Sequence, residues 1–214
     1  MRIIGTITLL ALLFVGCVKP SNEITANYNY EYFPLEVGQW SEYEVEEVFH
    51  TALSIDTSRY WLKEVITESF EDLGGRTSYR IERFWKTNMQ DEYTIKDVWY
   101  ANRTQNSAER IEENVRFVRL IFPLSLEKEW DGNLFNVHEE WNHEVDSLHV
   151  PLTLNNLVFD SVAYISQYDN VNPFQNQVAS EIYAKNVGLI KKDYVNIDNN
   201  IGNEIRMELV SYGK

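Results

Sequence analysis

Residues 41–49, with the sequence SEYEVEEVF, contain the pattern that decides the fold class of this chain. In an extended chain successive side chains point to opposite faces, so every second residue shares a face. One face of this stretch is apolar and the other is acidic; the members are Tyr43, Val45 and Phe49 on the first and Glu42, Glu44 and Glu46 on the second. A period of two with acids outward is typical of a half-buried β-strand. The stretch therefore predicts a strand with one face in a core and one in water.

Segments of the same kind follow along the rest of the chain. Residues 60–70 and 77–86 are predicted to form a hairpin, because the turn formers Asp72, Gly74 and Gly75 stand between them. Further strands are predicted at residues 93–102, 115–122, 157–168, 179–184, 189–197 and 204–212. Such even spacing of strands, without a long helical period, indicates an antiparallel sheet protein.

Two segments give other local signals. The dipeptide Asp131-Gly132 stands between apolar flanks and is the strongest hairpin signal in the chain, so residues 134–145 are expected to return as the second strand. Residues 105–114, QNSAERIEEN, favour one or two helical turns, because Ser107 can cap a helix and several good helix formers follow it.

These observations together predict a mainly β fold. We expect a single antiparallel, strongly curved sheet of about ten strands, a half-barrel or open barrel, with at most one or two short helices. Aromatic residues make up 14% of the chain and supply core material that suits strands. Residues 30–214 are expected to form this one domain.

The first residues have the features of an export signal. Arg2 precedes an apolar run at residues 3–15, and the small residue Gly16 follows it. A run of about 13 apolar residues is too short to cross a bilayer, which needs about 20. Residues 1–16 are therefore predicted to be a signal peptide that is removed.

Cys17, the single cysteine of the chain, follows this signal directly. It resembles the lipid-modified cysteine of bacterial lipoproteins, although Phe14 stands where that pattern usually has Leu. The resemblance implies a diacylglycerol on Cys17 and a third acyl chain such as palmitate, which together hold a protein firmly on a bilayer because each buried methylene contributes about 0.8 kcal/mol. Residues 17–29 are polar and aperiodic and are predicted to form a flexible tether. The alternative is an ordinary secretory signal with an incidental cysteine.

The residues after Cys17 include no Asp at the second position, which in lipoproteins generally implies the outer membrane. Whether the domain lies on the periplasmic or the outer face of that membrane stays open.

The remaining composition excludes several classes of protein. With a formal net charge of −14 and no basic cluster longer than Lys191-Lys192, the chain is not expected to bind nucleic acid. A single cysteine also excludes disulfides within the chain and cysteine-rich zinc sites.

Three blocks of sequence carry a family resemblance. They are residues 32–40, YFPLEVGQW; residues 120–124, LIFPL, with residues 130–133, WDGN; and residues 183–190, YAKNVGLI. With these blocks the chain resembles a group of lipoproteins from Bacteroidota that have no assigned function. The resemblance implies an architecture and an address in the cell envelope. The aromatic strand pairs are also similar to the curved half-barrel sheets of periplasmic lipid carriers.

No motif in the chain predicts a catalytic, cofactor-binding or metal site. His138 and His143 resemble the zinc-protease motif HExxH, but they are five residues apart, which puts them on different sides of a helix or a strand. Carboxylate pairs are too numerous to select one; the candidates are Glu42, Glu44, Glu46, Asp91, Glu92, Glu139, Glu140 and Asp146. A solvated strand face explains these acids better.

Two weaker patterns concern turns and modification. Residues 169–170 and 198–200 are rich in Asp and Asn, but they lack the spacing of a calcium loop and are expected to form turns. Ser147 and Ser161 each follow an Asp and precede an apolar residue, which resembles the O-glycosylation acceptor of exported Bacteroidota proteins.

Three functions remain open at this point. The preferred one is a non-catalytic envelope lipoprotein that binds an envelope protein or a glycan through exposed aromatic residues. The alternatives are a carrier of lipid or another apolar ligand in the curved sheet, and a hydrolase with a carboxylate pair, one of whose pKa values would be raised. The six tryptophans are expected to be mostly core; they are Trp40, Trp61, Trp85, Trp99, Trp130 and Trp141.

Overall fold

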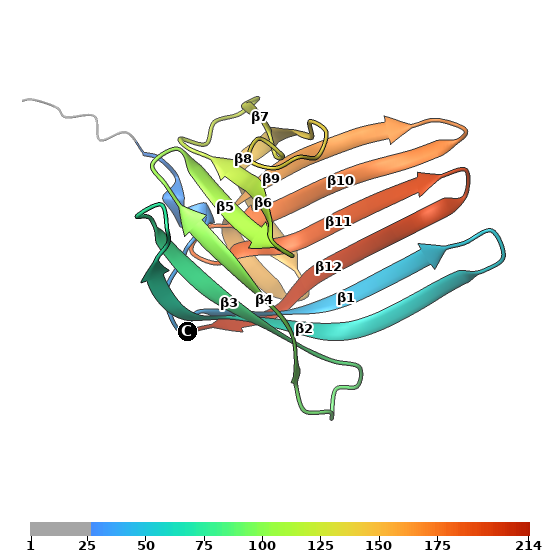
Figure 1. The fold of residues 1–214 in the computed structure, drawn as a ribbon, viewed down its shortest axis with the longest axis horizontal. Coiled ribbons are helices and arrows are strands. Elements are labelled where there is room, and N and C mark those ends of the chain that lie inside the picture. The colour runs from blue at the N-terminus through green and yellow to red at the C-terminus, as the bar shows by residue number, and fades with distance from the viewer. Residues whose placement is uncertain (1–26) are drawn as a thin grey trace, which may run out of the picture.

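The computed structural model describes residues 27–214, so the predicted signal peptide, Cys17 and most of the predicted tether lie outside the described residues. The described chain forms one sheet of twelve antiparallel strands in the order β6-β5-β4-β3-β2-β1-β12-β11-β10-β9-β8-β7 (Figure 1). The strands are β1 (Trp40–His50), β2 (Ile55–Glu71), β3 (Thr77–Lys86), β4 (Thr94–Arg103), β5 (Ser107–Glu112), β6 (Val115–Ile121), β7 (Glu129–Asp131), β8 (Asn142–Leu154), β9 (Leu157–Val171), β10 (Gln175–Ala184), β11 (Gly188–Asp198) and β12 (Ile201–Gly213). The predicted fold class is confirmed, with twelve strands instead of about ten. Among the described residues no helix is long and apolar enough to cross a membrane.

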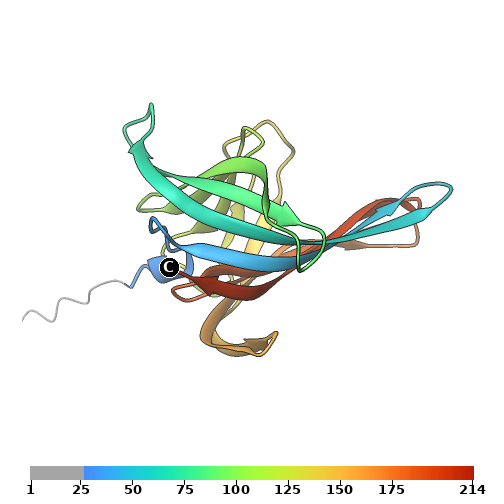
Figure 2. The ribbon, with the colours of Figure 1, turned by 90° about the horizontal axis from the view of Figure 1, so that it is seen from below.

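The two edge strands of the sheet approach one another. The backbone N–H of Val118 in β6 donates to the carbonyl of Gly132, just after β7, at 2.9 Å. The indole N–H of Trp130 in β7 donates to the carbonyl of Val118 at 3.1 Å. Because these bonds join the two edges of the sheet, the sheet curls nearly into a barrel (Figure 2).

Residues 105–114 form a strand and a turn, so the prediction of helical turns was wrong. β5 covers Ser107–Glu112, and its inward positions Ala108 and Arg110 are buried against the rest of the sheet. Glu113 and Asn114 have φ values of 48° and 65°, which is the left-handed conformation of a two-residue hairpin turn. Pairing of β5 with β4 and β6, and burial of the three consecutive residues 108–110, therefore override the local helix propensity.

The Asp131-Gly132 dipeptide begins a longer loop instead of a two-residue turn. β7 ends at Asp131 and pairs with the start of β8, but residues 132–141 separate them. The carboxylate Oδ1 of Asp131 accepts backbone N–H bonds from Asn133 at 2.8 Å and from Trp141 at 3.0 Å, so it organises that loop. The expected return strand at residues 134–145 was wrong at both ends, because β8 covers Asn142–Leu154.

The N-terminal part of the domain closes one end of the barrel. The 3-10 helix η1 (Tyr30–Tyr32) and the residues after it insert Tyr32, Phe33 and Leu35 into an apolar cluster. The cluster also contains Ile66, Ile81, Leu120, Phe122, Trp130, Val145 and Ile165. Each large side chain buried here stabilises the fold by about 1.5–3 kcal/mol. The barrel is therefore filled by apolar side chains at the end that η1 closes. The rest of its interior has a different lining, which is described below.

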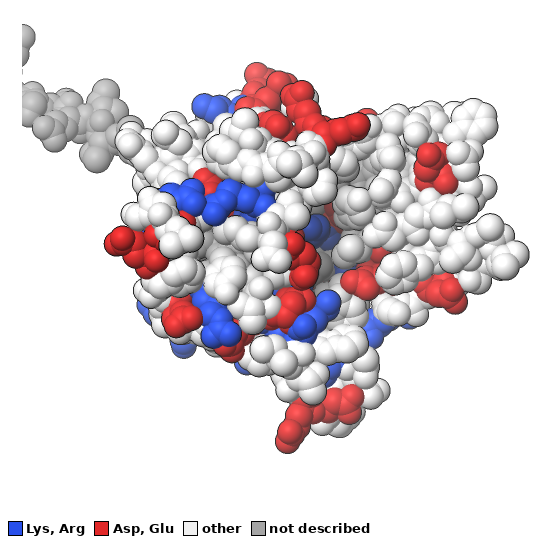
Figure 3. Space-filling model, viewed as in Figure 1, with Lys and Arg blue, Asp and Glu red and all other residues white. Residues whose placement is uncertain are grey.

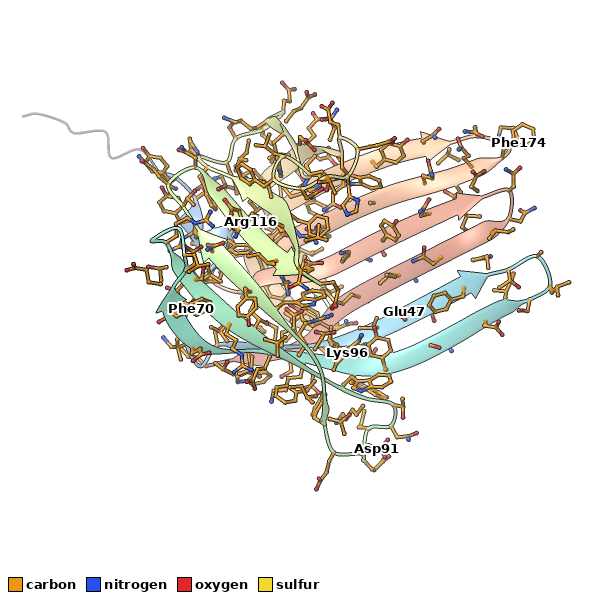
Figure 4. All side chains as sticks on the ribbon, in the orientation of Figure 1. Glu47, Phe70, Asp91, Lys96, Arg116 and Phe174 are labelled. Carbon is orange, nitrogen blue, oxygen red and sulfur yellow. The ribbon has the colours of Figure 1, made fainter. Side chains whose placement is uncertain are left out.

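Three hairpins run well beyond this barrel body. They are β1–β2, β9–β10 and β11–β12, and together they continue the sheet outward at the right of Figures 1 and 2. Residues 46–59, 168–178 and 193–205 form this part of the sheet, which we call the extension. Residues 51–59 are all exposed, and Phe174, labelled in Figure 4, lies at the tip of β9–β10. The extension thus presents both faces of a sheet to solvent.

Candidate functional site

Charged side chains line the concave face of the sheet, on the side of the barrel body that the apolar cluster leaves free. They surround a cavity of about 450 Å³. Seven of these residues form what we call the charged row: Glu64, Arg83, Arg110, Glu112, Arg119, Glu181 and Lys192. Six strands supply these residues, and each residue is at a position whose side chain points to the concave face. Glu64, for example, lies between the buried residues Leu62 and Ile66 of β2.

Glu64 is the centre of one half of the row. Its Oε1 accepts hydrogen bonds from Nε of Arg83 at 3.0 Å and from Nη2 of Arg110 at 2.9 Å. Arg83 also donates to both carboxylate oxygens of Asp97 at 2.9 Å. The ring of Trp99 covers the guanidinium of Arg83 at 3.4 Å from its centroid, and that of Arg110 at 4.9 Å. Such stacking on a partly buried cation is worth about 1 kcal/mol.

Arg119 is the centre of the other half. Its Nη2 donates to Glu112 at 2.6 Å and its Nη1 donates to Glu181 at 3.3 Å. Lys192 lies 3.6 Å from the same carboxylate of Glu181. The hydroxyl of Tyr183 donates to the other oxygen of Glu181 at 2.5 Å. Each charge of the row therefore has an opposite charge beside it, as buried ions require.

The carboxyl groups of the row stay ionised at neutral pH. Burial by itself would raise their pKa values, but Arg119 and Lys192 lower the pKa of Glu112 and that of Glu181 to about 2. Arg110 and Arg83 lower the pKa of Glu64 in the same way. A general acid at neutral pH needs a raised pKa, so these carboxyl groups do not match the hydrolase hypothesis.

A second cavity, of about 460 Å³, continues the first. Glu112, Arg119 and Lys192 line both of them, so we call the two cavities together the groove. The second cavity is bordered by aromatic rings, namely Phe117, His138, Trp141 and Tyr194. Figure 3 shows a hollow in the middle of the view with charged atoms inside it. Glu47 and Lys96, labelled in Figure 4, belong to the lining of the first cavity.

Three buried polar atoms of the groove have no hydrogen-bond partner within residues 27–214. One is Nε of Arg110, which lies 3.7 Å from Glu112 in the first cavity. The other two are Nδ1 of His143 and Nε2 of Gln167, and both of these residues line the second cavity. His143 is only 2% exposed, and its burial lowers its pKa to about 4, so the ring is neutral at pH 7. An unpartnered buried polar group costs about 1–3 kcal/mol, which a bound polar molecule would offset.

Gly132 is required beside His143. A Cβ at position 132 would lie 2.4 Å from Nε2 of His143, which is closer than real Cβ contacts come. The other side of the imidazole meets the edge of Trp130, with ring centroids 5.2 Å apart. The ring of His143 is therefore held in one place in the groove.

The two histidines of the HExxH-like segment have different surroundings. His138 belongs to the loop before β8 and stacks on Phe117, with centroids 6.3 Å apart, whereas His143 lies on the inner face of β8. Within residues 27–214 no three His, Cys, Asp or Glu side chains are placed to hold a metal ion.

The acids considered in the sequence do not gather in one place. Glu42 accepts from Tyr93, Glu46 from Arg59, and Asp146 from Ser166. Glu44, Asp91, Glu92, Glu139 and Glu140 are exposed. Of the acids considered in the sequence, Glu139 lines the second cavity. The three carboxylates of the charged row, Glu64, Glu112 and Glu181, line the first cavity and were missed by sequence reasoning. The available signal was a charged residue at an inward position of an alternating strand.

Other sequence predictions have mixed outcomes. Residues 198–200 form a turn as expected, with Asn199 and Asn200 at φ 50° and 64°, whereas Asp169 and Asn170 lie inside β9, so the turn predicted there was wrong. The expectation of a mostly buried set of tryptophans was also wrong: only Trp130 is buried in the described chain, and Trp99 and Trp141 line the groove. These two rings cover charges or other rings instead of filling the core.

The two predicted glycosylation acceptors are half-buried. Ser161 Oγ lies 2.7 Å from the hydroxyl of Tyr32, and Ser147 lies in β8 opposite Tyr164. Modification of these serines stays a prediction.

No family model and no curated protein matches the chain. Two crystal structures are similar to it. The first is of a protein from Bacteroides fragilis, provisionally described as exported and with a YMCC-like fold; it is 9% identical, has a TM-score of 0.48, and the match covers 85% of this chain and 98% of that one. The second is of a protein from Parabacteroides distasonis, provisionally described as a lipoprotein; it is 11% identical, has a TM-score of 0.45 and gives the same coverage. Neither description names a ligand or a reaction, so the function has to be inferred from the site itself.

Proposed function

We propose that this protein is a non-catalytic envelope lipoprotein that holds an uncharged, polar ligand in the groove. The observation that carries this proposal is the combination of a charged row whose members neutralise one another with Nδ1 of His143 and Nε2 of Gln167, two uncharged buried atoms that lack hydrogen-bond partners among residues 27–214. Because the charges are already paired, an ionic ligand would have to break an existing pair. A neutral ligand with hydroxyl or amide groups would instead satisfy His143 and Gln167.

The same features disfavour the two alternatives. A hydrocarbon chain in the groove would cover paired ions and unpartnered polar atoms, which gain no hydrogen bond from it. A carboxylate-pair hydrolase would need an acid with a raised pKa, but the carboxyl groups of the charged row have lowered ones.

The envelope address comes from the sequence. A signal peptide at residues 1–16 followed by Cys17 supports lipid anchoring, and the absence of Asp at the second position after cleavage supports the outer membrane. Labelling cells with radioactive palmitate tests this part. We expect label on the wild-type chain and none on Cys17→Ala, and label on both would contradict acylation at Cys17.

Native mass spectrometry tests the ligand. The full chain is expressed with its own leader, isolated from membranes in a non-glycosidic detergent, and examined for a non-covalent companion. We expect a polar, uncharged molecule, whereas a phospholipid or a free fatty acid in the groove would favour the carrier.

Gln167→Leu sharpens that experiment, because it removes one unpartnered polar atom. We expect this variant to lose the ligand while the free protein unfolds at the same or a higher urea concentration. Gln90→Leu, in the exposed loop between β3 and β4, is the matched control and should retain the ligand. Equal occupancy in the two variants would contradict a role for Gln167.

A further inference from the structure

The inner face of the extension carries a row of side-chain amides across four neighbouring strands. We call it the amide row; its members are Asn170 in β9, Gln177 in β10, Asn196 in β11 and Asn203 in β12. Each is directly opposite the next, because the register pairs Asn170 with Gln177, Gln177 with Asn196, and Asn196 with Asn203. Directly paired residues point to the same face of a sheet. Gln177 accepts from Asn170 at 3.3 Å and donates to Asn196 at 2.9 Å, as a shared face requires.

This face is continuous with the groove. Asn196 is two residues from Tyr194 in β11, so the two side chains point the same way, and Tyr194 lines the second cavity. Between the amide row and the groove lies an aromatic platform, namely Trp141, Tyr168 and Tyr194. The indole of Trp141 stacks on Tyr168 with centroids 4.9 Å apart and on Tyr194 at 6.4 Å, with interplanar angles below 30°.

The opposite face of the extension has a different chemistry. Arg59 donates to Glu46 at 2.7 Å, Arg206 donates to Asp193 at 3.3 Å, and His50 contacts Glu204 at 2.7 Å. These ion pairs lie on the outer face. The charged residues on the inner face of the extension are Glu47 and Asp56 in the β1–β2 hairpin and Asp198 at the end of β11. Figure 3 shows the face over β9–β12, next to the hollow, as largely free of charged residues.

An amide has two donor hydrogens and an acceptor oxygen with two lone pairs, so the bonds within the row leave part of this capacity unused. Neighbouring strands are about 4.8 Å apart, so the row offers such groups at regular steps. That step is close to the length of one pyranose ring in a linear polysaccharide. Hydroxyl groups both donate and accept, and the C–H faces of sugar rings pack on aromatic rings. A surface of neutral amides beside flat aromatics matches these needs, while it offers no counter-charge to an anion.

We propose that the amide row and the aromatic platform bind a neutral polysaccharide chain, which lies across β9–β12 beside the groove. This rests on the proposed function, because it names the class of the polar ligand. The inner face of the extension is then the surface that selects an uncharged sugar chain.

Affinity electrophoresis of the full chain, in a non-glycosidic detergent, tests the proposal. The gels contain galactomannan, xylan or mixed-linkage β-glucan as neutral probes, and polygalacturonate as the acidic probe. We expect at least one neutral probe to retard the wild-type protein, and polygalacturonate to leave it unretarded. Retardation by the acidic probe alone, or by none of the four, would overturn the proposal.

Matched variants locate the site. Gln177→Ala/Asn196→Ala should weaken retardation about tenfold or more, because two hydrogen-bonding groups are lost. Asn176→Ala is the control, since Asn176 is adjacent in sequence and points to the outer face of the same strand. Equal retardation of the double variant and the control would overturn the proposal.

A groove variant separates this proposal from the function on which it rests. Trp99→Ala alters the groove and leaves the extension untouched. If retardation is lost in Trp99→Ala but kept in the double variant, the groove binds the sugar and the platform does not. If a polar companion is seen by native mass spectrometry while no probe retards the protein, the proposed function stands and the polysaccharide proposal fails.

Discussion

The barrel body and the extension belong to one sheet, yet their inner faces have opposite chemistry. In the barrel body the concave face carries ions that are shielded from water and paired with one another, such as Glu64 with Arg83 and Arg110. In the extension the same face carries uncharged amides that water can reach, such as Gln177 and Asn196. Paired ions have little left to offer a ligand, whereas partly used amides keep donors and acceptors available. The charged row therefore organises the sheet, and the neutral surfaces are available for recognition.

Loss of one buried charge should have the largest effect on stability. Glu64→Gln leaves two buried guanidinium groups without their shared carboxylate, and we expect the free energy of unfolding to fall by about 3–5 kcal/mol. Glu46→Gln, whose partner Arg59 is exposed on the extension, should cost about 0.5 kcal/mol or less. Urea unfolding measures both, and similar losses would break the distinction between the two regions.

Acid should destabilise the barrel body in two stages. The pKa of His143 is about 4 in the folded protein against an ordinary 6.5, so the unfolded chain takes up a proton first and stability falls as pH drops from about 6.5 to 4. The pKa values of Glu112 and Glu181 are lowered from 4.5 to about 2, so their contribution is present above 4.5 and is lost between about 4.5 and 2. The first stage should amount to on the order of 2–3 kcal/mol.

Unfolding curves at a series of pH values measure these stages. His143→Phe should remove the upper stage and keep the lower one. A wild-type stability that is flat from pH 7 to 4 would contradict the neutral, buried state of His143.

Gly132→Ala should cost about 1–3 kcal/mol, because the added Cβ meets the imidazole of His143. Removing that ring should relieve the clash, so the double variant Gly132→Ala/His143→Ala should be more stable than the sum of the two single effects indicates. Thermal unfolding of all four proteins measures the coupling. Additive effects would show that the ring moves aside.

The smallest effect on stability is expected in the extension. Gln177→Ala/Asn196→Ala should change the free energy of unfolding by about 0.5 kcal/mol or less, because the row is open to water. The same variant should lose polysaccharide binding. A large loss of stability would show that the amide row supports the fold, which would remove the contrast with the charged row.

Much of the sheet was predictable from local pattern. The alternation in residues 41–49 gave β1 within one residue at each end, and the boundaries of β3 match the predicted residues 77–86. β5 was not predictable in this way, because its good helix formers become a strand only when β4 and β6 pair with both of its edges. The turns at Glu113-Asn114 and Asn155-Asn156 were missed for a related reason, since these residues adopt the left-handed conformation only when the flanking strands are in place.

Less of the candidate site was predictable. Glu64, Glu112 and Glu181 come from three strands that are distant in sequence, and nothing local indicates that they line one cavity together. The amide row depends on register, because a shift of one residue in any strand would send its amide to the outer face.

The sequence by itself predicts an export signal, and it determined the period-two strands and the acidic character of the chain, because these properties depend on local pattern and composition only. The tertiary structure alone decided which charges are paired, which polar atoms lack partners, and that four amides from four strands form one row. Those properties depend on curvature and register, which are set when distant strands pack together.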